Sequence, residues 1–297
     1  MDDVAAEQAR QNRTTERQWQ MYAAHRGQIE RLIVPAAPGS KLCVLGAGNC
    51  NDLDLRWLIE VYGEVHLVDL DADALRLATE RQGVAGSARI HFHAPFDLTN
   101  IVHEVAAWGK ATPSAAAIRA ATARALERPA VPWGSCDVVL SPCVLTQTIT
   151  PSRDLLRGVP DGTEAAVPTL KTALRDRHLR LIAASLANRG RGVLVIDAVS
   201  SEKVVDLARI PEGEVGAALD RLVAARKHFR GLDPASIVAA ARGAGLAAGM
   251  TPPWLWHLGL KKSFIVYGMV LQRVAKPGPP TNEVRRRDGG GALWGAP

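Results

Sequence analysis

Two glycines and one acidic residue occupy positions where a chain can hold a nucleoside. Gly46 and Gly48 follow a short apolar run at Leu42 to Leu45, and Asp69 closes a second run at Val65 to Val68. Glycine lets a backbone turn approach a ligand without interference from a Cβ atom, and a carboxylate can accept hydrogen bonds from ribose hydroxyls. The residue types and their order therefore suit a cofactor that carries a nucleoside.

The elements that must position these residues form one β-α-β unit. Both apolar runs are typical of parallel strands that are buried on two faces. Between them, Asn51 and Asp52 are good helix N-cap residues, and the apolar positions from Leu53 to Tyr62 fit a helix packed on a sheet. Because parallel strands end at the same edge of a sheet, the unit brings the glycine turn and Asp69 together.

Two nucleoside cofactors fit such a unit. The fingerprint for a dinucleotide needs a third glycine where Asn51 stands, so it is incomplete. The alternative is S-adenosylmethionine, because the chain resembles the class I (Rossmann-like) methyltransferases, whose first motif is a strand ending in Gly-x-Gly and whose second is an acidic residue closing the next strand. The chain departs from that pattern at two positions. Val44 stands where an acidic residue commonly begins the first motif, and Cys50 stands where the extended motif has its third glycine.

The resemblance extends to the third predicted strand. This strand spans Arg89 to His93, with Phe92 as its apolar centre, and Asp97 follows it closely. In the family, an acidic or polar residue at this place faces the adenine amino group, which implies that role for Asp97 and a wall for the ring at Leu98. Asp97 is also a typical turn or helix N-cap residue, and this alternative stays open.

The fourth predicted strand, Asp137 to Leu140, adds a second loop to the site. In a doubly wound sheet the first and fourth strands are neighbours at the topological switch point, where ligands bind beyond the carboxyl ends of the strands. The loop at Gly46 and the loop after the fourth strand therefore frame one pocket, which Cys50 and Cys143 could both line. The resemblance places Ser141 to Cys143 at the border of the methyl-transfer site.

The resemblance thus implies a set of cofactor contacts and leaves the catalytic residue open. The sulfonium of S-adenosylmethionine already carries an activated methyl group, so the protein need only align a nucleophile and exclude water. Hydroxyl and protonated amine acceptors also need a general base, for which His257, His25 and His228 are candidates. The predicted cofactor-binding residues are Gly46, Ala47, Gly48, Asn49, Asp69, Leu70, Asp97, Leu98, Ser141, Pro142 and Cys143.

The chain as a whole is predicted to form one α/β domain with extensions at both ends. Its 297 residues are 47% hydrophobic and 22% charged, enough to bury a sizeable core. Leu246 to His257 and Ser263 to Val274 read as two closing strands, a pair that resembles the reversed last strand of class I methyltransferases. We therefore expect a doubly wound, mostly parallel, seven-stranded sheet with a reversed last strand, in a three-layer α/β/α arrangement. The predicted divisions are an N-terminal helical lid at 1–34, a Rossmann-like methyltransferase domain at 35–275 and a disordered tail at 276–297.

Several segments beside the pocket are candidates for contacts with a substrate. Residues 151–172 are punctuated by Pro and Gly and read as a loop or short-helix insertion, followed by a helix at His178 to Asn188 and a fifth strand at Gly192 to Asp197. Trp254 and Trp256 alternate as on one face of a strand, and they either wall an acceptor site or pack in the core. Four residues of the N-terminal helix are either lid contacts or core: Trp19, Tyr22, His25 and Arg26.

Charge and cysteine content exclude several classes of protein. The net charge of +6 and the pI of about 9.4 come from arginines spread through the chain, which is typical of a solvated surface and does not favour nucleic acid as a partner. The 4 cysteines lack close metal-ligand spacing, so we expect buried free thiols in a reducing cytoplasm and no metal site. No apolar run approaches the ~18 residues of a membrane span, so no membrane partner is expected.

The sequence therefore predicts an S-adenosylmethionine-dependent methyltransferase that acts on a small molecule or a protein side chain. A non-catalytic Rossmann-type binding or assembly subunit is the first alternative, and a NAD-dependent oxidoreductase is the second. No motif in the sequence identifies the acceptor or the oligomeric state.

Overall fold

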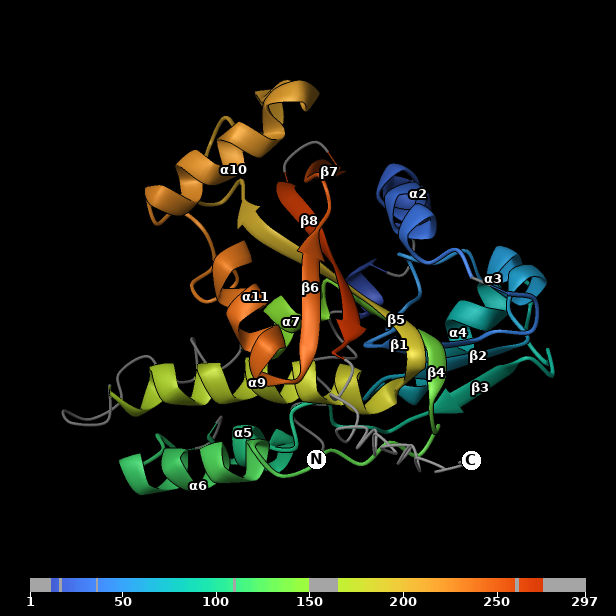
Figure 1. Ribbon diagram of the computed structural model, residues 1–297, viewed down its shortest axis with the longest axis horizontal. Helices are drawn as coiled ribbons and strands as arrows, with labels where there is room; N and C mark the ends of the chain where they lie inside the picture. Colours follow the sequence, from blue (N-terminus) through green and yellow to red (C-terminus); the bar gives the residue numbers. More distant parts are fainter. Residues whose placement is uncertain are drawn as a thin grey trace, which may run out of the picture.

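A single sheet with helices on both faces forms the centre of the structure (Figure 1). The computed structural model describes residues 12–15, 18–35, 37–108, 111–149, 165–259 and 262–274. The strands follow the order β3-β2-β1-β4-β5-β8-β6, and β7 pairs with β8. Their bounds are β1 (Lys41–Leu45), β2 (Glu64–Val68), β3 (Ile90–His93), β4 (Cys136–Pro142), β5 (Leu186–Ser200), β6 (Leu246–Met250), β7 (Trp254–Leu258) and β8 (Lys262–Arg273).

The strand directions confirm the predicted Rossmann-like sheet with a reversed last strand. Strands β1 to β5 are parallel to their neighbours, whereas β8 is antiparallel to β5, β6 and β7. Within the described residues the sheet has 8 strands instead of the expected seven, because Pro252 and Pro253 divide the predicted strand at Leu246 to His257. Proline has no amide N–H for a ladder bond, so β6 and β7 pair with β8 separately.

Alternate side chains of the strands divide the core into two layers. The helices are α2 (Ala23–Leu32), α3 (Leu55–Val61), α4 (Ala72–Arg81), α5 (Val102–Trp108), α6 (Ala115–Ala125), α7 (Val144–Ile149), α9 (Ala166–Ser185), α10 (Val215–Ala224) and α11 (Pro234–Gly243). Leu42 and Val44 of β1 pack on the face covered by α2, α3 and α4, whereas Cys43 and Leu45 pack on the face covered by α5, α6, α9 and α11. This alternation follows from the two-residue period of a strand and gives the expected three-layer α/β/α arrangement.

Helix α3 begins later than the sequence predicted. Its N-cap is Asp54, whose Oδ1 accepts hydrogen bonds from the backbone N of Arg56 and of Trp57, both at 3.1 Å. The predicted caps, Asn51 and Asp52, lie in the loop before the helix. The first turn of α3 is therefore closed by a carboxylate from its own N-cap.

Helix α9 is longer than predicted, and β5 follows it without a loop. The helix starts at Ala166, within the predicted insertion at 151–172, of which residues 151–164 lie outside the described residues. Pro168 is tolerated because it stands in the first turn, where its missing N–H has no helical partner. Gly190, predicted to end a helix, lies inside β5, where a Cβ atom would come within 3.0 Å of the carbonyl oxygen of Cys136.

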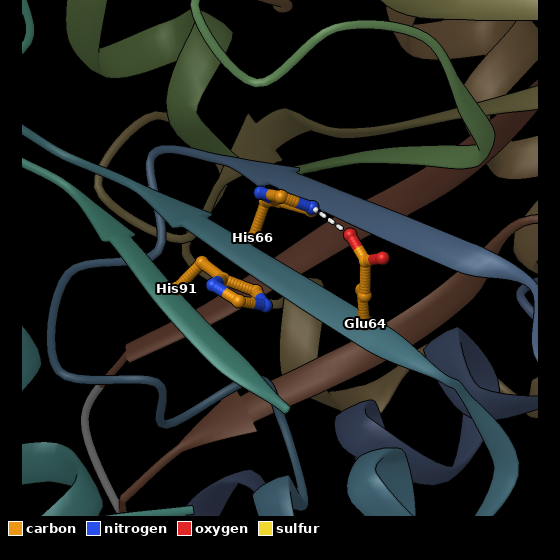
Figure 2. Close-up of side chains that lie close together, drawn as sticks. All are labelled: Glu64, His66 and His91. Atoms are coloured by element: carbon orange, nitrogen blue, oxygen red, sulfur yellow. Dashed lines mark hydrogen bonds and ion pairs between the residues drawn. The ribbon is translucent and has the colours of Figure 1, made fainter. Parts of the chain in front are cut away.

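Strand β3 lies at the edge of the sheet, and the side chain that was predicted to be its apolar centre points to solvent. Phe92, the expected apolar centre, is 46% exposed. Its neighbour His91 is paired with His66 of β2, and the two rings stack with centroids 4.8 Å apart. Figure 2 shows these rings together with Glu64, which begins β2. Three potential metal ligands thus share one face of the sheet at this edge.

The N-terminal helical segment packs against the closing strands. The ring of Tyr22 lies 5.0 Å from the ring of Trp256 on β7, in an edge-on arrangement. Residues 1–11, 16 and 17 of the predicted lid, and the whole predicted tail at 276–297, lie outside the described residues. Among the helices that are described, none is both long and apolar enough to cross a membrane.

Candidate cofactor site

A pocket lies at the carboxyl ends of β1, β2 and β4, where the sequence placed the topological switch point. The turns after β1 and β2 contribute to its lining, together with the last residue of β4, the first residue of α7 and the loop after β3. The predicted residues that line this pocket are Gly46, Ala47, Gly48, Asn49, Asp69, Leu70, Asp97, Leu98 and Pro142.

The turn after β1 requires glycine for two physical reasons. Gly46 has a φ of 76° and Gly48 a φ of 47°, both in the left-handed region that side chains with a Cβ atom rarely adopt. A Cβ atom on Gly46 would also lie 2.3 Å from Cγ2 of Val144, the first residue of α7. The turn can therefore pass directly against α7 and still present its backbone to the pocket.

Asp69 lies at the end of β2, between the glycine turn and the pocket. Its Oδ2 accepts a hydrogen bond from the backbone N of Gly48 at 2.8 Å, and its Oδ1 accepts one from the backbone N of Asp71 at 2.9 Å. The residue is 5% exposed, and burial raises its pKa, an effect that these backbone N–H groups oppose. A carboxylate has about four lone-pair sites, so Asp69 can still accept hydrogen bonds from a ligand hydroxyl.

The pocket is acidic. Asp52, Asp69 and Asp97 line it, and none of its described lining residues is Lys, Arg or His. The N-terminus of α3, the position at which a Rossmann fold binds pyrophosphate, is occupied by the carboxylate of its own N-cap Asp54. By simple charge complementarity, the site favours a cationic ligand over an anionic one.

Asp97 closes the turn between β3 and α5. Its Oδ1 accepts hydrogen bonds from the backbone N and the hydroxyl of Thr99, at 2.7 and 2.6 Å, and its Oδ2 accepts one from the backbone N of Val102 at 2.8 Å. The turn role that the sequence left open is thus present, in a residue that also lines the pocket. The neighbouring side chains form an apolar wall of the pocket: Leu98, Ile101, Val102 and Val105.

Ser141 and Cys143 do not line the pocket, in contrast to Pro142 between them. Ser141 faces α9, where its Oγ lies 2.7 Å from Nε2 of His178, since adjacent residues of a strand point to opposite faces. Burial lowers the pKa of His178 to about 4, so its ring is neutral near pH 7. The Sγ of Cys143 instead lies 3.8 Å from Nε2 of His25.

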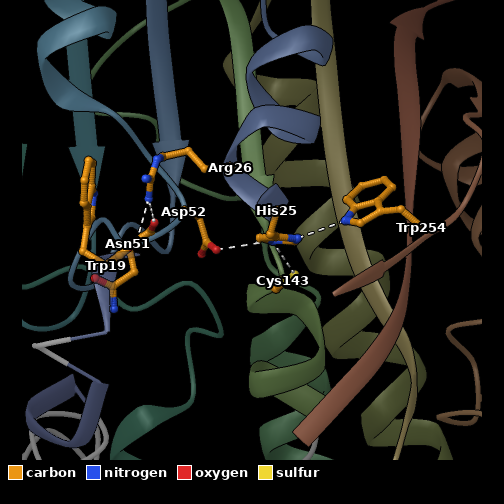
Figure 3. A network of polar contacts seen from close by, with 7 residues as sticks. All are labelled: Trp19, His25, Arg26, Asn51, Asp52, Cys143 and Trp254. Atoms are coloured by element: carbon orange, nitrogen blue, oxygen red, sulfur yellow. Dashed lines mark hydrogen bonds and ion pairs between the residues drawn. The ribbon is translucent and has the colours of Figure 1, made fainter. Parts of the chain in front are cut away.

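His25 belongs to a polar network that joins α2, the loop before α3 and β7 (Figure 3). Its Nδ1 accepts a hydrogen bond from Nε1 of Trp254 at 3.1 Å, and its Nε2 lies 3.3 Å from Oδ1 of Asp52. Because an indole N–H can only donate, the proton of a neutral His25 ring is on Nε2, the nitrogen that lies near both Asp52 and Cys143. The ring is 1% exposed and stacks on Trp256, and its neighbours Asp52 and Tyr22 line the pocket while the ring itself does not.

The other candidate bases lie away from the pocket. His257 is exposed on β7, where its Nδ1 lies 3.0 Å from the hydroxyl of Ser263. The Nε2 of His228 lies 3.7 Å from Oδ2 of Asp233, the N-cap of α11. Neither histidine lines the pocket. The tryptophans that precede His257 pack around His25, as the core alternative predicted.

The N-terminal segment completes the pocket with residues that sequence reasoning missed. Asn12 and Thr15 line it, as does Tyr22, the one predicted lid contact that does so among the described lining residues. The side-chain amide of Asn49 donates hydrogen bonds to the carbonyl oxygen of Asn12 and to the hydroxyl of Thr15, and is thus committed to this segment. No local signal marks these pairs, because their members are more than 30 residues apart in the sequence.

The four cysteines are free and buried, as expected. Neither Cys50 nor Cys143 lines the pocket, although both have a φ of 50° in the turns that frame it. Burial raises the pKa of both thiols, which keeps them protonated. They therefore act as small apolar groups behind the pocket wall.

No family model and no curated protein matches the chain. Similar solved structures include an O-methyltransferase family protein from Burkholderia thailandensis, with a TM-score of 0.48 and 13% identity over 90% of this chain and 60% of that chain. A SAM-dependent methyltransferase from Methanosarcina mazei has a TM-score of 0.47 and 11% identity, over 84% of this chain and 98% of that chain. A TehB-like SAM-dependent methyltransferase from Corynebacterium glutamicum has a TM-score of 0.42 and 13% identity, over 87% of this chain and 98% of that chain.

Strand order and direction define the fold independently of these similarities. Five parallel strands in the order β3-β2-β1-β4-β5, followed by the reversed β8 and then β6, give the chain the Rossmann-like fold of class I methyltransferases. The chain spans 60% of the length of the Burkholderia protein.

Proposed function

We propose that the chain is an S-adenosylmethionine-dependent methyltransferase that binds its cofactor in the acidic pocket. The observation that carries this proposal is the lining at the switch point, with three aspartates and no basic side chain among its described residues. S-adenosylmethionine carries a sulfonium cation, whereas NAD carries a pyrophosphate that needs cations or a free helix N-terminus. The charge of the lining and the capped N-terminus of α3 both favour the first cofactor.

The residues of the pocket fit such a cofactor. Asp69 has acceptor sites left for ribose hydroxyls after its two backbone bonds, and the turn at Gly46 and Gly48 gives a ligand close access to the backbone. The apolar wall beside Leu98 suits an adenine ring. Asp52 lines the pocket and can bind the methionine amine. In this role it would replace the acidic residue that the family commonly has where this chain has Val44.

The bound cofactor would supply an activated methyl group, so the protein has to orient the acceptor and exclude water. Asp52, placed to hold the methionine amine, has the imidazole of His25 beside it, with Nε2 of His25 3.3 Å from Oδ1 of Asp52. In this proposal His25 is a positioning residue, because its Nε2 lies close to Oδ1 of Asp52 and its ring does not reach the pocket.

A small molecule is the acceptor that we propose. Residues from the N-terminal segment line the pocket together with the wall at Leu98 to Val105, so an acceptor has to fit beside both. The hydrogen bonds from Asn49 and Asn51 to Thr15 hold the segment in place.

Calorimetric titration of the full chain with S-adenosylmethionine, S-adenosylhomocysteine and NAD in parallel tests this function. Binding of the first two ligands at micromolar concentration, without binding of NAD, is the expected result. Binding of NAD alone would favour an oxidoreductase, and no binding of any of the three would favour a subunit that keeps only the fold.

A further inference from the structure

A cluster of nitrogen and oxygen ligands lies at the opposite end of β2 from the cofactor pocket. Glu64 begins β2 and Asp69 follows its last residue, so the two positions are separated by the whole strand. Glu64 and His66 point to the same face because they are two residues apart, and His91 joins them from the paired position on β3. Figure 2 shows the three side chains converging on one volume beside the sheet.

The ligand atoms of this cluster lie almost close enough together to bind one metal ion. The Oε2 of Glu64 lies 3.1 Å from Nε2 of His66, and one ligand atom from each of the three side chains lies within 4.8 Å of the others. Zinc binds imidazole nitrogen and carboxylate oxygen at about 2.0–2.2 Å, so small rotations of the side chains would bring all three atoms onto one ion. His66 is buried, whereas Glu64 and His91 are partly exposed, which leaves a path for an ion.

A fourth residue holds the central ligand in place. The Nδ1 of His66 lies 2.8 Å from Nε2 of His93, two residues beyond His91 on β3. A histidine that binds a metal through one nitrogen almost always donates a hydrogen bond from the other, and this bond fixes the ring. His66 has this arrangement already, with Nε2 directed to Glu64 and Nδ1 directed to His93.

Lys41 would compete with a metal ion for the carboxylate of Glu64. Its Nζ lies 2.8 Å from Oε2 of Glu64, so the lysine supplies the positive partner of the carboxylate. Its side chain is 38% exposed and can turn into solvent, which makes it a replaceable partner.

We propose that Glu64, His66 and His91 bind a divalent transition-metal ion, with zinc as the ion that these ligands suit best. Two imidazoles and one carboxylate suit zinc, whereas magnesium and calcium prefer oxygen ligands alone. Water would complete the coordination. Because the ligands come from β2 and from the edge strand β3, the ion would fasten that edge to the sheet, away from the cofactor pocket. This proposal does not depend on the proposed methyltransferase function.

The cysteine spacing that predicted no metal site could not detect this cluster. His66 and His91 are 25 residues apart, and only the register of β2 with β3 brings them together. Their spacing matches no local zinc motif.

Titration of the metal-stripped full chain with ZnCl₂, followed by calorimetry, tests the site. We expect one zinc ion per chain, with no competition from excess MgCl₂. His91→Ala should weaken binding by about 10-fold or more, and His93→Ala by about 10- to 100-fold, because it removes the hydrogen-bond partner of His66. His103→Ala, at an exposed position on α5, is the matched control and should bind zinc as the unaltered chain does.

Glu64→Gln keeps the size of the side chain and removes its charge, so it tests the site even where a histidine variant fails to fold. It should weaken zinc binding and abolish the rise in thermal midpoint that zinc gives the unaltered chain. Equal zinc affinity in the unaltered chain, Glu64→Gln and His91→Ala would overturn the proposal. So would the absence of zinc binding by the unaltered chain.

Discussion

Gly46 lies so close to Val144 that a Cβ atom on the glycine would come 2.3 Å from Cγ2 of the valine. We therefore expect Gly46→Ala to lower the free energy of unfolding by about 2–5 kcal/mol, from the left-handed φ and from overpacking against α7. Urea denaturation measures this loss.

Gly39→Ala is the control for that variant. Gly39 has a φ of 78°, close to that of Gly46, but a Cβ atom there would meet no atom within 4 Å. We expect only the backbone cost, about 1–2 kcal/mol. Equal losses for the two variants would contradict the close approach of the glycine turn to α7.

Asp69 is predicted to contribute binding free energy to the cofactor. Asp69→Asn keeps the shape of the side chain and removes its charge, and we expect S-adenosylhomocysteine affinity to fall by about 1–3 kcal/mol, the cost of an unsatisfied polar group. Asp73→Ala, at an exposed position in the first turn of α4, should leave affinity unchanged. Unchanged affinity in a folded Asp69→Asn variant, measured by calorimetry, would refute the ribose role of Asp69.

Asp197 makes stability depend on pH. Burial raises its pKa from 3.8 to about 7, although the hydroxyl of Thr146 donates a hydrogen bond to its Oδ1. A raised pKa in the folded state stabilises the protein fully below the unfolded pKa, and this contribution is lost as the pH rises through the folded pKa. The free energy of unfolding should therefore fall between pH 3.8 and about 7 through this group.

Urea denaturation across that pH range compares the chain with Asp197→Asn. The variant should show a shallower decline than the unaltered chain, because its amide does not titrate. Asp206→Asn alters an exposed aspartate and should follow the unaltered chain. Parallel curves for the chain and for Asp197→Asn would contradict the raised pKa.

His25→Phe separates ring packing from hydrogen bonding in the network of Figure 3. Phenylalanine keeps a ring to stack on Trp256 but gives Nε1 of Trp254 no acceptor. We expect a loss of about 1–3 kcal/mol in the free energy of unfolding, since a buried donor is left without a partner. His103→Phe, at an exposed position, should change stability little, and an equal loss in both variants would show that the bond to Trp254 is not stabilising.

The fold was predictable because its signals are local. The run at Leu42 to Leu45, the glycines after it and Asp69 define one β-α-β unit within a short stretch, and the structure has this unit. Boundaries were less predictable. Asp54 was not identified as the cap of α3 because Asn51 and Asp52 are equally good cap residues by type. The side-chain amide of Asn51 instead donates a hydrogen bond to the carbonyl oxygen of the distant Thr15.

The site was predictable only where the residues follow a strand end. Gly46, Gly48 and Asp69 line the pocket because all parallel strands end at one edge. Ser141 does not line it, because the face of β4 to which it points depends on the register of the strand and on its partner His178. Pairs such as His25 with Asp52 join distant segments, and no local pattern marks them.

A crystal structure of the chain grown with S-adenosylhomocysteine tests directly whether the acidic pocket holds the cofactor. We expect the ribose hydroxyls within hydrogen-bond distance of the Asp69 carboxylate and the adenine ring beside Leu98. A ligand bound elsewhere on the chain, or an empty pocket at saturating ligand, would contradict this.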